Sequence, residues 1–362
     1  MDDVKNALLG ALWVVILVCM IAKAKRRPEL VCMLCLTAGL FFCRPSCAQD
    51  DRTLEKCVLM GSVLPLIGEP NDTPLVRANL DGHDVAIFVS PEISKLIVRD
   101  VSNDFWFPDH GAARLMAQDH QMERANWTQI EDLRLGEVRI GPVPGLVIDP
   151  TFPKTIGDLP IIGIVGRNIL VQGLIEMIDI PHRAVAFLRW DYDRCGPAAN
   201  LLGPGGHVMR LSDDNAVRGT VSGRRFDIHF DPDLAYNTFP ADNVSDIGIT
   251  REEMNAFPKV NLRFSEINVG RLSDSRPVTL ANDSIGSQQF LIQRRVSRVV
   301  LGSAFFQTRT VLFDFNHHQI SYVNVPSSSP ATANTGRFHF DMTYIPHAAV
   351  TESAGESGHV QH

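Results

Sequence analysis

Basic residues are few in this 362-residue chain: 34 Lys and Arg stand against 41 Asp and Glu, which gives a net charge of -7 at pH 7. Aromatic residues form only 7% of the composition, and they are not interleaved with Lys and Arg. Proteins that bind nucleic acid present a basic patch or stripe. The sequence therefore argues against nucleic acid as a partner.

Signatures of common enzyme chemistry are also missing. The chain contains no HExxH zinc motif, no Walker A phosphate loop, no GxSxG nucleophile elbow and no GxGxxG dinucleotide fingerprint. His317 and His318 fall in an expected turn, where exposed histidines are commoner than metal ligands. We expect neither a metal site nor a cofactor.

Long apolar runs are confined to the first fifty residues. A basic cluster, KAKRR, separates a run at 7–22 from a second run at 30–43. Residues 1–48 are predicted to be a signal peptide cleaved after Ala48; if translation starts at Met20, the first apolar run falls away and the remainder is an ordinary signal peptide. The alternative is a membrane anchor with the basic cluster in the cytoplasm. We therefore expect a periplasmic or secreted protein, or one anchored in the inner membrane and facing the periplasm.

Cysteine is almost absent after this leader. Of the seven cysteines, only Cys57 and Cys195 lie beyond residue 48. An even number of cysteines in an oxidising compartment favours one disulfide, and two buried free thiols are the alternative.

What the sequence does contain is a repeat. Residues 80–94 read LDGHDVAIFVSPEIS, and residues 221–235 read VSGRRFDIHFDPDLA. In each copy a glycine precedes a Ser or Asp by eight positions, and that residue is followed by proline and an acid. Each copy is followed later by two apolar residues and a glycine, Gly166 in one and Gly302 in the other. Matched landmarks at a period of roughly 140 residues indicate a duplicated lobe.

The repeat sets the expected organisation of the chain. Residues 49–190 form the first lobe, residues 191–208 a linker rich in Gly and Pro, and residues 209–325 the second lobe. Residues 326–362 are polar and are predicted to be a disordered tail.

Periodicity within each lobe predicts strands. Apolar and polar residues alternate through Leu133, Leu135, Val138, Ile140 and Val143, and in the second lobe through Leu262, Phe264, Ile267 and Val269. Such alternation is typical of half-buried antiparallel strands.

Helices are expected to be few and short: one at 112–119, one after Gly166 and one after Gly302. The prediction is a mainly β protein in which each lobe is a closed or folded sheet of six to seven strands.

In these features the chain resembles the aspartic peptidases, and among them most closely the bacterial retropepsin-like proteins with two lobes in one chain. The resemblance rests on the glycine turn, the apolar strand, the Ser or Asp loop, and the later apolar-apolar-Gly element with its short helix. It implies two half-barrel lobes related by a pseudo-twofold axis. It also implies a dyad with one aspartate from each lobe, the two carboxyls sharing a proton.

The catalytic motif itself has diverged. Ser90 occupies the first-lobe aspartate position, and Asp231 occupies the second. Pro and an acid follow each of them, so Glu92 and Asp233 stand where the family has glycine. Two interpretations remain. In the first, each Ser/Asp-Pro-acid sequence starts a helix and Asp231 is a helix cap. In the second, the acids form a rearranged dyad in which Glu92 faces Asp233 or Asp231.

The resulting hypothesis is an exported, monomeric aspartic-peptidase-like protein without catalytic activity, which binds a peptide or envelope component in the cleft between its lobes. One alternative is an active endopeptidase that uses Asp231 with a non-standard second acid. Another is a scaffold or assembly subunit tethered to the membrane by its N-terminus.

Overall fold

The computed structural model describes residues 56–69, 72–99, 105–116, 122–148, 153–261, 269–294 and 296–325. The chain divides into two compact units, Met1–Val58 and Leu59–His362, and nearly all described residues belong to the second. No helix among the described residues is long and apolar enough to cross a bilayer. The predicted leader at 1–48 and the predicted tail at 326–362 lie outside the described residues.

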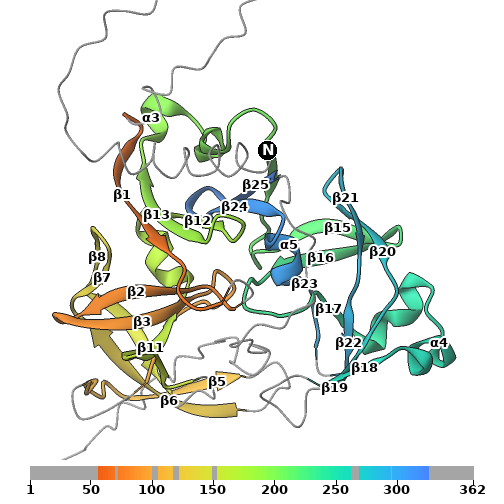
Figure 1. Ribbon diagram of the computed structural model, residues 1–362, viewed down its shortest axis with the longest axis horizontal. Coiled ribbons are helices and arrows are strands. Elements are labelled where there is room, and N and C mark those ends of the chain that lie inside the picture. The colour runs from red at the N-terminus through yellow and green to blue at the C-terminus, as the bar shows by residue number, and fades with distance from the viewer. Residues whose placement is uncertain are drawn as a thin grey trace, which may run out of the picture. The chain divides into compact units, whose positions relative to one another are not determined.

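Three β-sheets carry the described part of the chain, and the first of them has ten strands (Figure 1). These strands are β2 (Leu75–Leu80), β3 (His83–Val89), β4 (Leu96–Val98), β5 (Ala112–Met116), β6 (Met122–Ile130), β7 (Leu133–Leu135), β8 (Val138–Ile140), β9 (Val143–Val147), β10 (Thr155–Ile156) and β11 (Leu159–Val165).

The second sheet has nine strands. They are β15 (Val217–Val221), β16 (Arg224–Phe230), β17 (Thr238–Pro240), β18 (Lys259–Asn261), β19 (Val269–Leu272), β20 (Arg276–Leu280), β21 (Asp283–Gln288), β22 (Leu291–Gln293) and β23 (Val299–Leu301).

These two sheets have the same strand order. The first runs β5-β6-β9-β4-β11-β3-β2-β7-β8, with β10 attached to β11, and the second runs β18-β19-β22-β17-β23-β16-β15-β20-β21. Every strand of the second sheet therefore has a counterpart in the first. The repeat in the sequence is a repeat of the whole lobe.

A third sheet of six strands joins the lobes in the order β1-β13-β12-β24-β25-β14. Its strands are β1 (Val58–Pro65), β12 (Ile175–Asp179), β13 (Ala184–Trp190), β14 (His207–Arg210), β24 (Arg309–Asp314) and β25 (Gln319–Asn324). Each lobe contributes three strands, and β12 pairs with its counterpart β24 in antiparallel register at the centre. The prediction of a mainly β, two-lobed fold is therefore confirmed.

Seven short helices interrupt the strands of the described residues. They are η1 (Arg167–Gln172), α3 (Tyr192–Cys195), η2 (Ala198–Leu202), η3 (Ala241–Ile247), α4 (Arg251–Ala256), α5 (Ser303–Phe306) and η4 (Phe315–His317). The helices expected after Gly166 and Gly302 are η1 and α5. The expected linker, 191–208, contains α3, η2 and the start of β14.

Two predictions about the elements were wrong. The expected helix at 112–119 begins instead as strand β5, because Ala112–Met116 pairs with β6 and this ladder outweighs the local helix preference of Ala, Leu and Met. The sheets also exceed the expected six to seven strands, because three-residue strands such as β4 and β17 carry too little periodic signal to be found in the sequence.

The alternating pattern of the first lobe is confirmed. Leu133, Leu135, Val138, Ile140 and Val143 are all buried, and the residues between them in β7 and β8 are exposed. Of the matching pattern in the second lobe, Leu262, Phe264 and Ile267 lie outside the described residues, and Val269 begins β19.

A tight turn explains the glycine that opens each repeat. Asp81 and Gly82 between β2 and β3 both have positive φ, at 49° and 89°, and Ser222 and Gly223 between β15 and β16 match them at 49° and 79°. Two consecutive residues with positive φ are characteristic of a type I′ hairpin, which suits the twist of paired strands. This turn fixes the register of the strand that leads to Ser90 or Asp231.

Candidate functional site

Ser90 and Asp231 occupy the same place in the two lobes, immediately after a central strand. β3 is parallel to β11 and β16 is parallel to β23. The Ser90 N–H donates to the carbonyl of Val165 at 3.0 Å, and the Asp231 N–H donates to that of Leu301 at 3.0 Å. Both side chains therefore begin where the strand ladder ends.

The later glycine of each repeat allows the backbone to pass close to this loop. A Cβ atom at Gly166 would collide with carbonyl oxygens of the residues that follow Ser90. One at Gly302 would collide with the carbonyl oxygens of Leu234 and Tyr236. Because the glycines precede η1 and α5, they pack the start of each short helix directly against its loop.

The two loops meet at Ser90 and Asp231. The Ser90 Oγ donates to Oδ1 of Asp231 at 3.5 Å, although 141 residues separate them in the sequence. Ser90 is 1% exposed and Asp231 is 5% exposed. The hydroxyl thus stands where the resemblance implies a second carboxyl, and it faces the Asp231 carboxylate.

Asp233 lies behind this pair and is completely buried. Its N–H donates to Oδ1 of Asp231 at 3.0 Å, and its carbonyl accepts from the Thr73 hydroxyl at 3.5 Å. Burial raises the pKa of the Asp233 carboxyl well above its usual value, and the nearby charges of Asp231 and Glu176 raise it further, while the Ser90 hydroxyl opposes the shift.

The expectation that Asp231 caps a helix was wrong. No helix follows either Ser90 or Asp231; Ser90 is followed by a bend and Asp231 by a turn. The Asp231 side chain instead accepts from the N–H two residues later, as in an Asx turn. The proline and the acid after Asp231 thus belong to a turn that keeps the carboxylate at the end of β16.

Glu92, the counterpart of Asp233, lies in basic surroundings. One carboxylate oxygen is 3.3 Å from a guanidinium nitrogen of Arg298 and 3.4 Å from Nδ1 of His229. Glu92 is also close enough to the largely buried Arg167 guanidinium to raise its pKa, against the stronger lowering effect of burial. Glu92 and His229 are each 4% exposed. The Glu92 carboxylate thus binds second-lobe side chains.

Glu176 is a member of this site that sequence reasoning missed. It lies on β12, is 1% exposed, and neither of its carboxylate oxygens has a hydrogen-bond partner. Burial raises its pKa to about 8. The sequence IEMIDI did hold a signal for the burial of Glu176. Glu176 and Ile178 are two positions apart on one strand, so their side chains face the same side, and Ile178 is buried.

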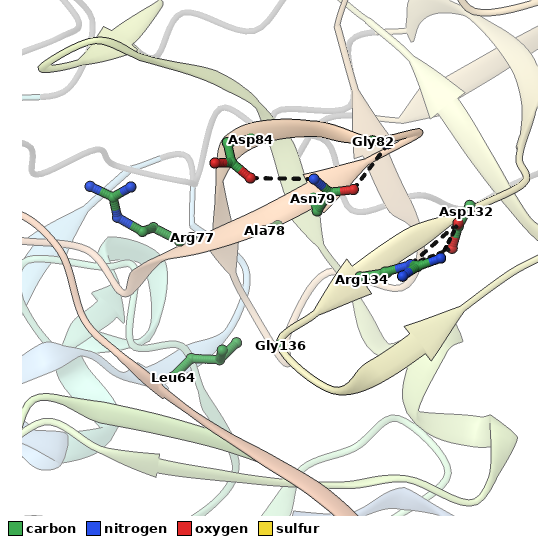
Figure 2. Close-up of a pocket in the computed structure, with 9 residues that line it drawn as sticks. All are labelled: Leu64, Arg77, Ala78, Asn79, Gly82, Asp84, Asp132, Arg134 and Gly136. Carbon is green, nitrogen blue, oxygen red and sulfur yellow. Dashed lines mark hydrogen bonds and ion pairs between the residues drawn. The ribbon is translucent and has the colours of Figure 1, made fainter.

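Two surface hollows lie outside the Ser90–Asp231 pair. One, of about 610 Å³, lies against β2 and β7; in Figure 2 Asn79 pairs with Asp84 and Arg134 with Asp132, whereas no interaction is drawn for Arg77. The other, of about 310 Å³, is lined in part by His229 and Arg298, the partners of Glu92.

No group of three or more His, Cys, Asp or Glu side chains with the geometry of a metal site occurs among the described residues. Cys57 and Cys195 form a disulfide, as predicted.

Two lobes of equal topology, joined by a six-stranded sheet and each delivering one loop to a central polar pair, define an aspartic-peptidase-like fold. A solved structure of the aspartic proteinase from Irpex lacteus is similar to this chain with a TM-score of 0.50 and 8% sequence identity, over 76% of this chain and all of the other. No family model matches the sequence, and no curated protein is similar to it in sequence. The likeness therefore concerns the fold.

Proposed function

We propose that this chain is an exported aspartic-peptidase-like protein that does not cleave peptides and instead binds an extended peptide or another envelope component between its lobes. The observation that carries this proposal is Ser90, whose hydroxyl faces Asp231 at the position of the missing carboxyl.

The chemistry of an aspartate dyad needs two carboxyls, one as base toward water and one as acid toward the carbonyl oxygen. A serine hydroxyl can donate and accept a hydrogen bond, but it does not exchange a proton in the pH range in which a carboxyl does. Asp231 paired with Ser90 therefore supplies one of the two roles and leaves the other unfilled.

The other two acids of the motif, Glu92 and Asp233, do not replace the missing carboxyl. Glu92 is held by Arg298 and His229. Asp233 is completely buried, so it has no surface on which to meet a substrate. Asp233 can influence Asp231 through space, but neither acid is in position to protonate a bound peptide.

Support for peptide binding comes from two strands at matching sheet edges. β5 ends the first sheet and β18 ends the second, and each is followed by its hairpin partner, β6 or β19. An edge strand can extend its ladder to an extended peptide through main-chain hydrogen bonds, without any chemistry. Lobes that retain their topology while losing the dyad would keep this capacity.

Export, and a place among the two-lobed bacterial retropepsin-like proteins, are further parts of the proposal. The Cys57–Cys195 disulfide supports an oxidising compartment. The spacing of the repeated motifs supports the retropepsin-like type, and the pairing of two lobes within one chain supports a monomer.

The test is a cleavage assay of the purified protein on denatured casein at acid and neutral pH, with and without pepstatin. We expect no cleavage. We also expect the immobilised protein to retain synthetic extended peptides from a random mixture and to release them uncut, as read by mass spectrometry. Failure to retain any peptide would contradict the binding part of the proposal.

A second candidate function is an endopeptidase that uses Asp231 with a non-standard second acid. The observation in its favour is the raised pKa of Asp233, which lies beside Asp231 and can hold a proton there. Pepstatin-sensitive cleavage that is lost in Asp231→Asn and kept in Asp227→Asn would establish it, because Asp227 is an exposed acid of β16, the strand that precedes Asp231. The same result would overturn the non-catalytic proposal.

A further inference from the structure

One position of the repeat has an apolar side chain in the first lobe and a polar one in the second. His229 precedes Asp231 by two residues at the end of β16, and Phe88 precedes Ser90 by two residues at the end of β3. Phe88 is completely buried in an apolar cluster, whereas His229 lines the hollow of about 310 Å³. At this position the two lobes therefore differ in kind: one has core packing and the other a polar cavity wall.

The neighbouring strand differs between the lobes in the same way. Ile161 and Ile162 of β11 precede the later glycine of the first repeat by the same number of residues as Ser297 and Arg298 precede that of the second. Both isoleucines are 0% exposed, whereas Ser297 and Arg298 line the hollow. Three apolar side chains of the first lobe thus correspond to three polar ones around one cavity, and this concerted change indicates a binding site.

The pairing of the strands explains why a cavity exists here. β16 and β23 lie side by side (Figure 1), and their parallel ladder pairs Ile228 with Val299 and continues from there toward Asp231. In the first lobe the corresponding ladder starts earlier, with Ala86 paired to Ile161. The hollow therefore occupies the place where the two chains of the second lobe separate.

His229 and Arg298 supply hydrogen-bond donors on one side of the hollow. The same Glu92 carboxylate oxygen lies 3.4 Å from His229 Nδ1 and 3.3 Å from a guanidinium nitrogen of Arg298. With Nδ1 turned to Glu92, the opposite ring nitrogen, Nε2, is left for a ligand, and a guanidinium retains further N–H groups after one contact. His229 is 4% exposed, so it is fixed in the wall of the cavity.

An acid lines the same hollow. Asp214 lies in the turn before β15, is exposed, and forms no ion pair with any other described residue. Asp227 also lines the hollow, but its carboxylate lies 3.9 Å from the guanidinium of Arg218. The hollow therefore offers a carboxylate acceptor in addition to the donors of His229 and Arg298.

Much of the remaining wall is apolar. Phe226, Pro240 and Val299 contribute it, and the last two are buried. A volume of about 310 Å³ lies at the lower end of the range of small-molecule sites, about 300 to 1,000 Å³. The hollow thus suits a small molecule that has a short apolar group and charges of both signs.

We propose that this hollow binds a free α-amino acid with an apolar side chain. Arg298 and His229 hold its carboxylate, since a guanidinium and a carboxylate form strong charge-assisted hydrogen bonds, and Asp214 holds its ammonium group. The side chain of the ligand packs against Phe226 and Val299. A ligand with one charge would satisfy only one of these two ends. The proposal does not depend on the function proposed for the cleft between the lobes.

Isothermal titration calorimetry of the full-length protein with three related ligands tests the chemistry. Leucine has both charges, N-acetylleucine lacks the ammonium group, and leucinamide lacks the carboxylate. We expect leucine to bind at one site and each analogue to bind at least about tenfold more weakly. Absence of leucine binding up to about 10 mM, or an analogue that binds as tightly as leucine, would overturn the proposal.

Substitutions then assign the binding to this hollow. Asp214→Asn should weaken leucine binding at least about fivefold, whereas Asp213→Asn, a change of an exposed neighbour that does not line the hollow, should not. Arg298→Gln should weaken it at least about tenfold, and the exposed Arg294→Gln should bind as the wild type does. If Arg298→Gln folds poorly, the surface substitution of Asp214 remains a sufficient test. Equal leucine binding by Asp214→Asn and Asp213→Asn would overturn the assignment.

Discussion

Glu92 and Asp233 hold equivalent positions in the two lobes, yet their electrostatic surroundings are opposite. Glu92 contacts Arg298 and His229, whereas Asp233 lies beside Asp231 and Glu176. Both loops carry the same Pro-acid sequence. Because different residues pack around the two loops, the two acids have different surroundings. One ties the lobes together through charge, and the other remains buried and tends to stay protonated.

The contact between Glu92 and Arg298 should contribute to stability. Arg298→Gln removes one member of an ion pair whose carboxylate is buried, and the loss of one partner of a buried pair is costly. Because the Arg298 side chain is 39% exposed, we expect a loss of about 1 to 3 kcal/mol in the free energy of unfolding. Urea denaturation at neutral pH measures it.

Arg294→Gln is the matched control, since Arg294 is exposed and only four residues away. Its free energy of unfolding should lie within about 0.5 kcal/mol of the wild type. Equal effects of the two substitutions would mean that the contact with Glu92 adds nothing to the fold.

Replacing Ser90 by aspartate should make stability depend on pH. In Ser90→Asp a second carboxyl stands where the hydroxyl is now 3.5 Å from Asp231, and two such acids cannot both ionise cheaply. The pKa of the pair rises in the folded state, so the stability is retained in acid and lost as the pH increases. We expect a free energy of unfolding about 1 to 3 kcal/mol below that of the wild type at neutral pH, and near it at acid pH.

Ser90→Asn is the control that separates the effect of the added charge on stability from the effect of the larger side chain. It has the size of aspartate without the ionisation, so any destabilisation it causes should be the same at both pH values. A pH-independent loss in Ser90→Asp, equal to that in Ser90→Asn, would show that the two carboxyls do not interact.

The sequence was sufficient to predict the duplicated lobe because the residues that determine its topology are local. The type I′ turns at Gly82 and Gly223 and the close approaches at Gly166 and Gly302 impose conditions that few residues satisfy, so they persist in both copies. The same landmarks place Ser90 and Asp231 at equivalent loop positions.

Features that depend on distant partners were not predictable in this way. Arg298 is 206 residues from Glu92, and nothing in either segment signals the other. The supposed helix start after Asp231 failed for a related reason: the strand pairing before it and the glycine contact behind it leave room for a turn only. The local preference of Asp, Pro and acid for a helix start is weaker than these tertiary constraints.

The close approach at Gly302 makes a further prediction. Gly302→Ala places a methyl group against the carbonyls of Leu234 and Tyr236, so the loop or α5 must move. Strain of this kind typically costs about 1 to 3 kcal/mol. Thermal or urea unfolding should register it, and Gly166→Ala should behave alike because its surroundings are equivalent.

Gly206→Ala is a suitable comparison, because the nearest atom to its added methyl would be the Leu202 Cβ at 3.4 Å. It should change stability by about 0.5 kcal/mol or less. If Gly302→Ala were as mild, the packing of α5 on the Asp231 loop would be looser than its glycine implies.

The disulfide between Cys57 and Cys195 should stabilise the folded chain by restricting the unfolded one. It closes a loop of more than 100 residues, for which the loss of chain entropy corresponds to about 2 to 5 kcal/mol. The double variant Cys57→Ser with Cys195→Ser should therefore unfold at lower urea than the oxidised wild type. Wild type reduced with dithiothreitol should match the double variant, since both lack only the bond. If reduction lowers stability while the double variant does not, the effect belongs to the thiols and not to the cross-link.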